Sequence, residues 1–317
     1  MSDSFTFGGD IVWRPTREHI ERAHLTAFMR QHGIENFDAL MKRSTEDVAW
    51  FTDAVLKYLD IQFCEPYSQA VDLSNGIQLP KWCVGGVMNI VHNCVDKYQS
   101  SGFSDQLAVG WEGEEGATRS LSYKELYEQV NQAANALRSL GLGKGDAVGL
   151  FMPMTPEIVV ALLAIAKIGG IILPLFSGYG AGAVVSRMTD ADAKALFTAD
   201  GAFRRGKPVE MKSVADEAAA QIPTLKHMIV LKRTGQDVTM KEGRDHWWHE
   251  LVASQPVEAE TEQTSAEDPL MVIYTSGTTG KPKGAVHTHC GFPVKAAQDM
   301  AFGTDVHGAS TSLLEEH

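Results

Sequence analysis

The sequence predicts a doubly wound α/β fold with a mainly parallel sheet, preceded by a helical and irregular amino-terminal region. Three observations support this prediction. From residue 107 onward, short apolar runs alternate with helical patterns, which is typical of βαβ units. The 317 residues suffice for one large domain or two ordinary ones, at about 150 residues per domain. Apolar residues make up 44% of the chain and charged residues 21%, as in soluble globular proteins.

The first 105 residues predict helices and irregular segments. Apolar residues recur at helical spacing over residues 19–29 and 46–59, and a polar loop is expected around residues 72–78. No motif in this region indicates a particular chemistry.

The sheet-forming region begins with a predicted strand at residues 107–111. Ser122 precedes the next helical pattern and has Glu125 three residues on, which is the sequence of a capping box. Gly141 is expected to end this helix. Further strands are predicted at residues 147–151, 171–175, 195–198, 227–231 and 270–274, and the acidic segment 254–268 predicts a surface loop.

The longest apolar stretch, residues 158–175, is too interrupted to span a membrane. Lys167 lies near its middle, and a central lysine costs roughly 2.5–3.5 kcal/mol on insertion scales. Gly169, Gly170 and Pro174 break the run further. We therefore predict a buried helix, a turn and a buried strand, and no membrane partner.

Charge and cysteine spacing restrict the partners and the compartment. The 40 acidic and 28 basic residues give a net charge of -12, so nucleic acid is not an expected partner. The four cysteines have neither C-x-x-C nor zinc-site spacing, and we expect no signal peptide, because the first residues lack a basic stretch followed by an apolar run. We expect reduced thiols, no metal site and a cytoplasmic protein, and leave the oligomeric state open.

A glycine-rich loop, TSGTTGKPKG, occupies residues 275–284. Glycines allow successive N–H groups to converge on an anion, hydroxyl groups add donors, and Lys281 and Lys283 add positive charge. The loop is not a Walker A loop, because only two residues separate Gly277 from Gly280 and a proline follows the first lysine. These features predict a phosphate-binding loop.

The surroundings of this loop predict a hairpin. A strand is expected on each side, at residues 270–274 and 285–287, whereas a Walker A loop leads into a helix. We therefore expect a mobile loop between two strands. A flexible turn with incidental lysines is the alternative.

The segment YTSGTTGKPKG at residues 274–284 resembles the phosphate-binding signature of the AMP-forming adenylating enzymes, the acyl-CoA synthetase and luciferase group. Other stretches narrow the resemblance to acetyl-CoA synthetases and their short-chain relatives, and coverage runs from about residue 45 to residue 307. The resemblance implies ATP-dependent joining of a carboxylate to AMP, release of pyrophosphate, and transfer of the acyl group to coenzyme A. The stretches that narrow the resemblance to acetyl-CoA synthetases are residues 82–96, WEG at 111–113, FMPMTPE at 151–157 and residues 227–248.

The resemblance implies two groups of binding residues. Coenzyme A would contact Gly178, whose backbone can approach closely, and its phosphorylated adenosine end would lie near Arg204 and Lys207. The family usually has arginine at the second basic position, so Lys207 would lack the bidentate hydrogen bonds that arginine makes to a phosphate. The alternative is that Arg204 and Lys207 are ordinary charged residues of a solvated surface loop. The triphosphate of ATP, with Mg²⁺, would be bound by Thr275, Ser276, Gly277, Thr278, Thr279, Gly280, Lys281 and Lys283.

The resemblance covers only the first half of such an enzyme. It implies that residues 1–105 are an acetyl-CoA synthetase type amino-terminal region, that residues 106–307 are a partial AMP-binding domain, and that GASTSLLEEH at 308–317 is foreign to the family. The adenine, ribose and Mg²⁺ motifs, the acyl pocket and the catalytic lysine would lie in the missing half. We therefore assign no catalytic residue and no metal ligand, and expect this chain alone to be inactive.

The truncation implied by the resemblance would affect solubility, and it leaves the acyl substrate unidentified because the acyl pocket is missing. The strands at residues 270–274 and 285–286 would be exposed at an edge, which predicts poor solubility. Acetate is favoured as substrate only by subfamily likeness, with propionate, 3-hydroxypropionate and acetoacetate as alternatives.

Two other function classes remain open. Gly178, Gly180 and Ala183 form G-x-G-x-x-A between a predicted strand and helix, and Asp200 follows about 20 residues on, as in nicotinamide-dinucleotide-binding oxidoreductases. The other class is a natural short product that binds ATP or coenzyme A without catalysis.

Two smaller signals have structural explanations. The segment HTHC, with His287, His289 and Cys290, suggests a metal site, but we expect structural or loop-facing histidines. Trp247 and Trp248 are expected to pack as an aromatic pair on a helix rather than stack on a base.

Overall fold

The computed structural model describes residues 12–100, 102–275, 282–307 and 313–315. It divides into two compact units. The first comprises Met1–Asp60 and Val294–Ser310, and the second comprises Ile61–Pro293 and Thr311–His317.

The first unit is helical, as predicted for the start of the chain. Its core centres on Phe28, which is fully buried and packs against the rings of Tyr58 and Phe302. The helix predicted over residues 19–29 is in fact two helices, because the backbone at Ala23 is extended, with φ -61° and ψ 138°. The helices are α1 (Arg17–Arg22), α2 (His24–Gln31), α3 (Phe37–Glu46), α4 (Val48–Tyr58) and α11 (Phe292–Phe302).

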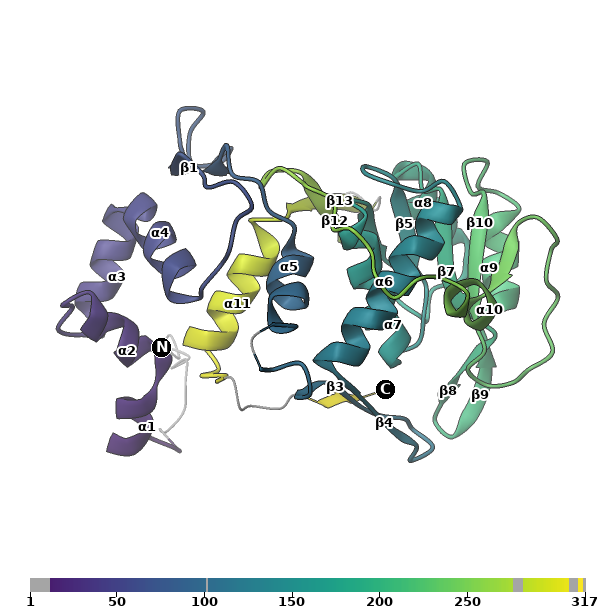
Figure 1. Cartoon of the computed structure of the whole chain (residues 1–317), viewed down its shortest axis with the longest axis horizontal. Helices are drawn as coiled ribbons and strands as arrows, with labels where there is room; N and C mark the ends of the chain where they lie inside the picture. The colour runs from purple at the N-terminus through teal and green to yellow at the C-terminus, as the bar shows by residue number, and fades with distance from the viewer. Residues whose placement is uncertain (1–11, 101, 276–281, 308–312, 316–317) are drawn as a thin grey trace, which may run out of the picture. The chain divides into compact units, whose positions relative to one another are not determined.

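The second unit contains a seven-stranded sheet in the order β11-β10-β7-β5-β6-β12-β13 (Figure 1). All neighbouring strands are parallel except β12 and β13, which are antiparallel. The predicted mainly parallel α/β sheet is therefore confirmed. The strands are β5 (Ala147–Leu150), β6 (Ile171–Pro174), β7 (Ala195–Ala199), β10 (His227–Leu231), β11 (Asp245–Trp247), β12 (Pro269–Thr275) and β13 (Lys283–Thr288).

Helices between these strands pack in two groups. Helix α6 contacts α7 and α10, whereas α8 contacts α9. The capping box at the start of α6 is confirmed, since Ser122 and Glu125 each accept the other's backbone N–H. Gly141 follows the end of this helix with φ 78°, as expected. The helices are α6 (Tyr123–Ser139), α7 (Pro156–Lys167), α8 (Ala181–Asp190), α9 (Lys212–Ala219) and α10 (Trp248–Ala253).

The predicted strand at residues 107–111 forms but lies outside the main sheet, which corrects the sequence interpretation. As β3 (Leu107–Glu112) it pairs antiparallel with β4 (Thr118–Ser122) and parallel with β14 (Leu313–Glu315). The polar segment around residues 72–78 connects the two strands of a further antiparallel hairpin, β1 (Gln69–Asp72) and β2 (Lys81–Val84). The remaining elements are α5 (Ile90–Cys94), η1 (Asp96–Tyr98), β8 (Gly201–Arg204) and β9 (Lys207–Glu210).

The apolar stretch at residues 158–175 forms α7, a turn and β6, as predicted. Lys167 is completely buried, and its Nζ lies 2.9 Å from Oδ1 of Asp96. Burial lowers the pKa of Lys167, and the adjacent carboxylate opposes that shift. In the part of the chain that the structure describes, no helix has the length and apolar character needed to cross a membrane.

The cysteines correct the expectation of four reduced thiols. Cys83 and Cys290 are joined as a disulfide, with their Cα atoms 6.9 Å apart, whereas Cys64 and Cys94 are free. The two bonded residues are 207 positions apart, so local spacing could not indicate the pairing.

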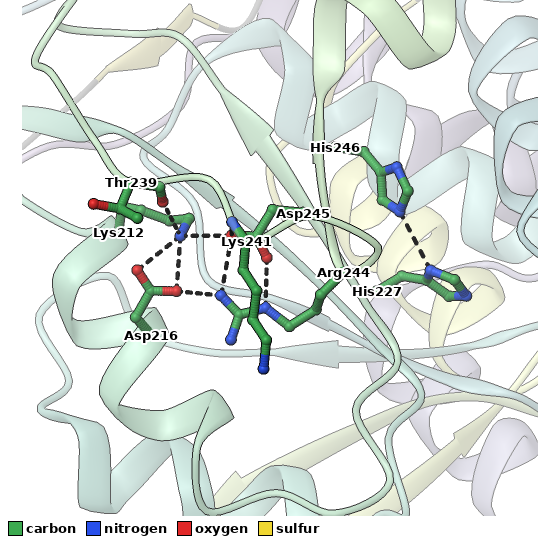
Figure 2. Close-up of polar contacts among 8 residues, drawn as sticks. All are labelled: Lys212, Asp216, His227, Thr239, Lys241, Arg244, Asp245 and His246. Carbon is green, nitrogen blue, oxygen red and sulfur yellow. Dashed lines mark hydrogen bonds and ion pairs between the residues drawn. The ribbon is translucent and has the colours of Figure 1, made fainter.

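A buried ion cluster ties α9 to the start of β11 (Figure 2). Nζ of Lys212 contacts both carboxylate oxygens of Asp216 at 2.7 Å, Asp245 at 2.9 Å and the carbonyl of Thr239 at 2.9 Å. Arg244 pairs with the same two carboxylates. Each charge is compensated, so the cluster orients the helix that follows the β8–β9 hairpin.

Strand β13 forms one edge of the main sheet, and its residue Val286 is 59% exposed. The expected exposure of residues 270–274 is wrong, because β12 lies between β6 and β13. Its residues Leu270 and Met271 are buried.

Candidate functional site

The predicted phosphate loop connects β12 to β13. Thr275, the last residue of β12, pairs with Lys283, the first residue of β13, and both side chains are exposed. The predicted strands on the two sides of the loop are confirmed and pair antiparallel, whereas a Walker A loop leads from a strand into a helix. The other predicted phosphate-binding residues lie outside the described residues. They are Ser276, Gly277, Thr278, Thr279, Gly280 and Lys281.

Side chains from α8 fix the end of β12. The hydroxyl of Tyr274 donates a hydrogen bond of 2.5 Å to Oδ2 of Asp190. Burial and this carboxylate raise the pKa of Tyr274, which keeps the phenol protonated. The guanidinium of Arg187 lies 4.4 Å from the ring centroid of Tyr179 and 5.8 Å from that of Tyr274. Sequence reasoning missed these contacts, because only the tyrosine before the loop lies within the motif.

Gly178 lies in the turn between β6 and α8. A Cβ atom added there would lie 2.6 Å from the ring of Phe176, whose side chain is 60% exposed and can move. A small side chain would therefore fit at this position only if the Phe176 ring moved.

Arg204 and Lys207 face each other across the β8–β9 hairpin, as a cross-strand pair flanking its turn. The turn residues Arg205 and Gly206 have φ values of 53° and 73°, the left-handed conformation of a tight two-residue turn. Both basic side chains are exposed. The structure thus places the two basic residues next to each other at the end of one hairpin.

The three predicted groups leave the same edge of the sheet. The turn with Gly178 follows β6, the β8–β9 hairpin follows β7, and the phosphate loop follows β12. These strands are mutually parallel through the order β7-β5-β6-β12, so their carboxyl ends lie on one side. Ligands of open α/β sheets bind at this edge. The described residues provide no direct hydrogen bond between the groups.

The dinucleotide alternative depends on Asp200, and the structure gives that residue another role. Its side chain is completely buried. Oδ1 accepts N–H groups of Gly201, Arg233 and Thr234 at 2.7, 2.8 and 3.0 Å, and Oδ2 accepts that of Gly235 at 2.7 Å. A carboxylate saturated by backbone donors is not available to a ribose hydroxyl, which argues against an oxidoreductase.

His289 has a structural environment, in line with our expectation. It is completely buried, Nδ1 accepts the backbone N–H of Ile90 at 3.3 Å, and burial lowers its pKa to about 4. The tryptophans only partly match the expected aromatic pair on a helix. Trp247 ends β11, whereas Trp248 begins α10 and packs 5.5 Å from the ring centroid of Phe197.

Comparison with known proteins agrees with this arrangement. Residues 97–313 match the family model described as AMP-binding enzyme, and residues 37–94 match the acetyl-coenzyme A synthetase N-terminus. The acetyl-coenzyme A synthetase of Methanothrix thermoacetophila is 42% identical over 290 residues, covering 91% of this chain and 43% of that protein. That of Mycobacterium tuberculosis is 40% identical over 295 residues, covering 92% and 43%.

A solved structure gives the same result for the fold. The acetoacetyl-CoA synthetase from Streptomyces lividans superposes with a TM-score of 0.84 at 28% identity, covering 93% of this chain and 46% of that one. The chain thus spans less than half the length of these relatives. Because the family model matches most of its residues, the chain belongs to the AMP-binding enzymes.

Proposed function

We propose that this chain is the amino-terminal part of an ATP-dependent ligase that joins acetate, or a similar short-chain carboxylate, to coenzyme A. The reaction proceeds through an acyl-adenylate with release of pyrophosphate. The observation that carries this proposal is the antiparallel pair β12–β13, in which Thr275 and Lys283 flank the signature loop at the carboxyl edge of a sheet belonging to an AMP-binding enzyme. Acetate is favoured by the acetyl-coenzyme A synthetases among the relatives.

The phosphate hairpin has the chemistry that leaving-group stabilisation requires. Thr275 and Lys283 stand exposed on opposite strands, so hydroxyl and ammonium donors can reach one anion from both sides. Charge-assisted hydrogen bonds to pyrophosphate strengthen as negative charge develops on it. Mg²⁺, when bound with ATP, neutralises phosphate charge. The hairpin residues themselves bind and orient the triphosphate.

The β8–β9 hairpin supplies the second anion site. Arg204 and Lys207 would bind the phosphorylated adenosine end of coenzyme A, and the turn at Gly178 would admit the same ligand close to the backbone. The proposed partners, ATP, a short-chain carboxylate and coenzyme A, are all small molecules. We place the reaction in the cytoplasm.

The test is exchange of labelled pyrophosphate into ATP, using a protein in which this chain is continued by the segment present in its relatives. We expect exchange with acetate and none without a carboxylate. Exchange driven by a long-chain fatty acid, or by no carboxylate at all, would overturn the assignment. A titration with NAD followed by fluorescence tests the oxidoreductase alternative, and we expect no binding.

A further inference from the structure

The WEG residues 111–113 lie beside the β8–β9 hairpin, although the proposed reaction does not use them directly. Trp111 is buried near the end of β3 and its indole Nε1 donates to the carbonyl of Met154 at 2.7 Å. The β3–β4 turn then carries Glu114 and Glu115 toward the tip of the other hairpin, and Figure 1 shows the two hairpins side by side.

Glu114 binds the turn that separates the two basic residues. Oε1 accepts the backbone N–H of Arg205 at 2.7 Å, and Oε2 accepts that of Gly206 at 2.9 Å. Because both residues have positive φ, their N–H groups converge on one acceptor, as in an anion-binding nest. An ionised carboxylate makes both bonds charge-assisted.

Arg233 makes a second attachment at the stem of the hairpin. Its guanidinium lies 5.1 Å from the ring centroid of Trp111 and 4.8 Å from that of Phe203, which precedes Arg204 on β8. The same guanidinium pairs with Glu115 at 2.7 Å, and only 11% of the arginine side chain is exposed. The arginine therefore links the WEG strand to the strand that carries the first basic residue.

These contacts matter because β8 and β9 form a two-stranded sheet of their own, without a backbone ladder to the main sheet. An isolated two-stranded hairpin is marginal in water, so side chains must set its orientation. Two carboxylates next to an anion site would weaken anion binding unless their charges were compensated. Here the turn amides compensate Glu114, and Arg233 compensates Glu115.

We propose that Glu114 and Arg233 are positioning residues, which hold the β8–β9 hairpin so that Arg204 and Lys207 are preorganised for the phosphorylated adenosine of coenzyme A. This inference rests on the proposed function. Preorganisation improves affinity by removing the ordering cost from the binding step. The competing possibility is that Glu114 occupies the nest in place of a ligand phosphate and weakens coenzyme A binding.

The test compares Glu114→Ala with wild type in the 317-residue chain. Hydrogen exchange of the Arg205 and Gly206 amides reports on the attachment without any ligand, and it should accelerate in the variant. Calorimetry with coenzyme A should show about tenfold weaker binding, whereas MgATP affinity should stay within about twofold. The ratio of affinities for coenzyme A and 3′-dephospho-coenzyme A should also fall.

Two further variants sharpen the test. Glu112→Gln removes one charge from the exposed face of β3, where no described hydrogen bond or ion pair is lost, and should change neither readout. Arg233→Lys keeps the charge near Glu115 but loses the planar contact with the rings of Trp111 and Phe203. It should weaken coenzyme A binding and leave MgATP binding unchanged.

Each outcome decides the proposal. Unchanged amide exchange in Glu114→Ala would show that the carboxylate does not hold the turn, and faster exchange with unchanged coenzyme A affinity would show that holding it does not matter. Tighter coenzyme A binding would support the competitor role instead. A wild-type chain that binds MgATP but no coenzyme A would overturn both this inference and the coenzyme A part of the proposed function, whereas failure of Glu114→Ala alone would leave that function intact.

Discussion

Two hairpins at the carboxyl edge of one sheet carry the predicted anion-binding residues, and they are supported differently. The β12–β13 hairpin continues the main sheet, because β12 pairs with β6 as well as with β13. The β8–β9 hairpin has no such ladder and is held by Glu114, Arg233 and Asp200. Backbone hydrogen bonds orient the first, whereas side chains orient the second. Substitutions of supporting side chains should therefore affect the second hairpin more strongly.

The largest effect is expected from Asp200→Asn, at the base of the β8–β9 hairpin. The buried carboxylate accepts four backbone N–H groups, and an amide would place donors against donors. We expect a loss of about 3 kcal/mol in the free energy of unfolding, measured by urea denaturation. Asp237→Asn, in the loop between β10 and β11, is the matched control. A loss below about 1 kcal/mol would show that this hairpin needs less side-chain support than the comparison claims.

A pH titration tests the base of the other hairpin, where buried His289 follows β13. Its pKa is lowered by burial to about 4 from 6.5, so the unfolded chain binds the extra proton between these values. Stability contributed by the neutral imidazole is present above pH 6.5 and should fall by about 3 kcal/mol as the pH drops to 4. Urea denaturation across this range should give a steeper slope in His287→Gln than in His289→Gln, in which other histidines with a lowered pKa, such as His227, still contribute. Equal slopes in the two variants would assign the effect to groups other than His289.

A pair of lysine substitutions separates the two anion sites. Lys283→Ala should weaken MgATP binding about tenfold and leave coenzyme A binding unchanged, because a charge-assisted hydrogen bond is lost at one hairpin only. Lys207→Ala should do the reverse with a smaller effect, about threefold, since Arg204 on the facing strand still supplies a charge to the same anion. Calorimetry measures both, with Lys226→Ala at the opposite end of β10 as control. Equal loss of both ligands in either variant would contradict two separate sites.

The smallest effect is expected for Tyr274→Phe, which removes only the hydrogen bond to Asp190 at the end of β12. The strand keeps its backbone partners, so we expect about 1 kcal/mol of destabilisation and a change in MgATP affinity within about threefold. Asp190→Ala, which removes the acceptor, should behave alike, and a double-mutant cycle should show the two losses to be non-additive. A tenfold loss of MgATP affinity would mean that side chains position this hairpin too.

The same difference explains what could be predicted from the sequence. Buried strands such as β5, β7 and β10 have continuous apolar runs, so the sequence predicts them, whereas phosphate binding by the loop at residues 275–284 stays a prediction. The β9 strand is fully exposed and β11 is three residues long, so neither has an apolar pattern. Glu114 acts on a turn 91 residues away, and no local spacing encodes such a contact. Asp200 matched a dinucleotide motif by position, but its environment, not its spacing, decides its role.

The strand order also sets the distance between the two hairpins. The strands that lead into the hairpins, β7 and β12, are separated by β5 and β6, which makes three strand spacings. At about 4.8 Å each, the two hairpins leave the edge about 14 Å apart. A single inhibitor that engages both hairpins must therefore bridge that length, and no loop substitution can shorten it, because the backbone ladder of the sheet sets the interval.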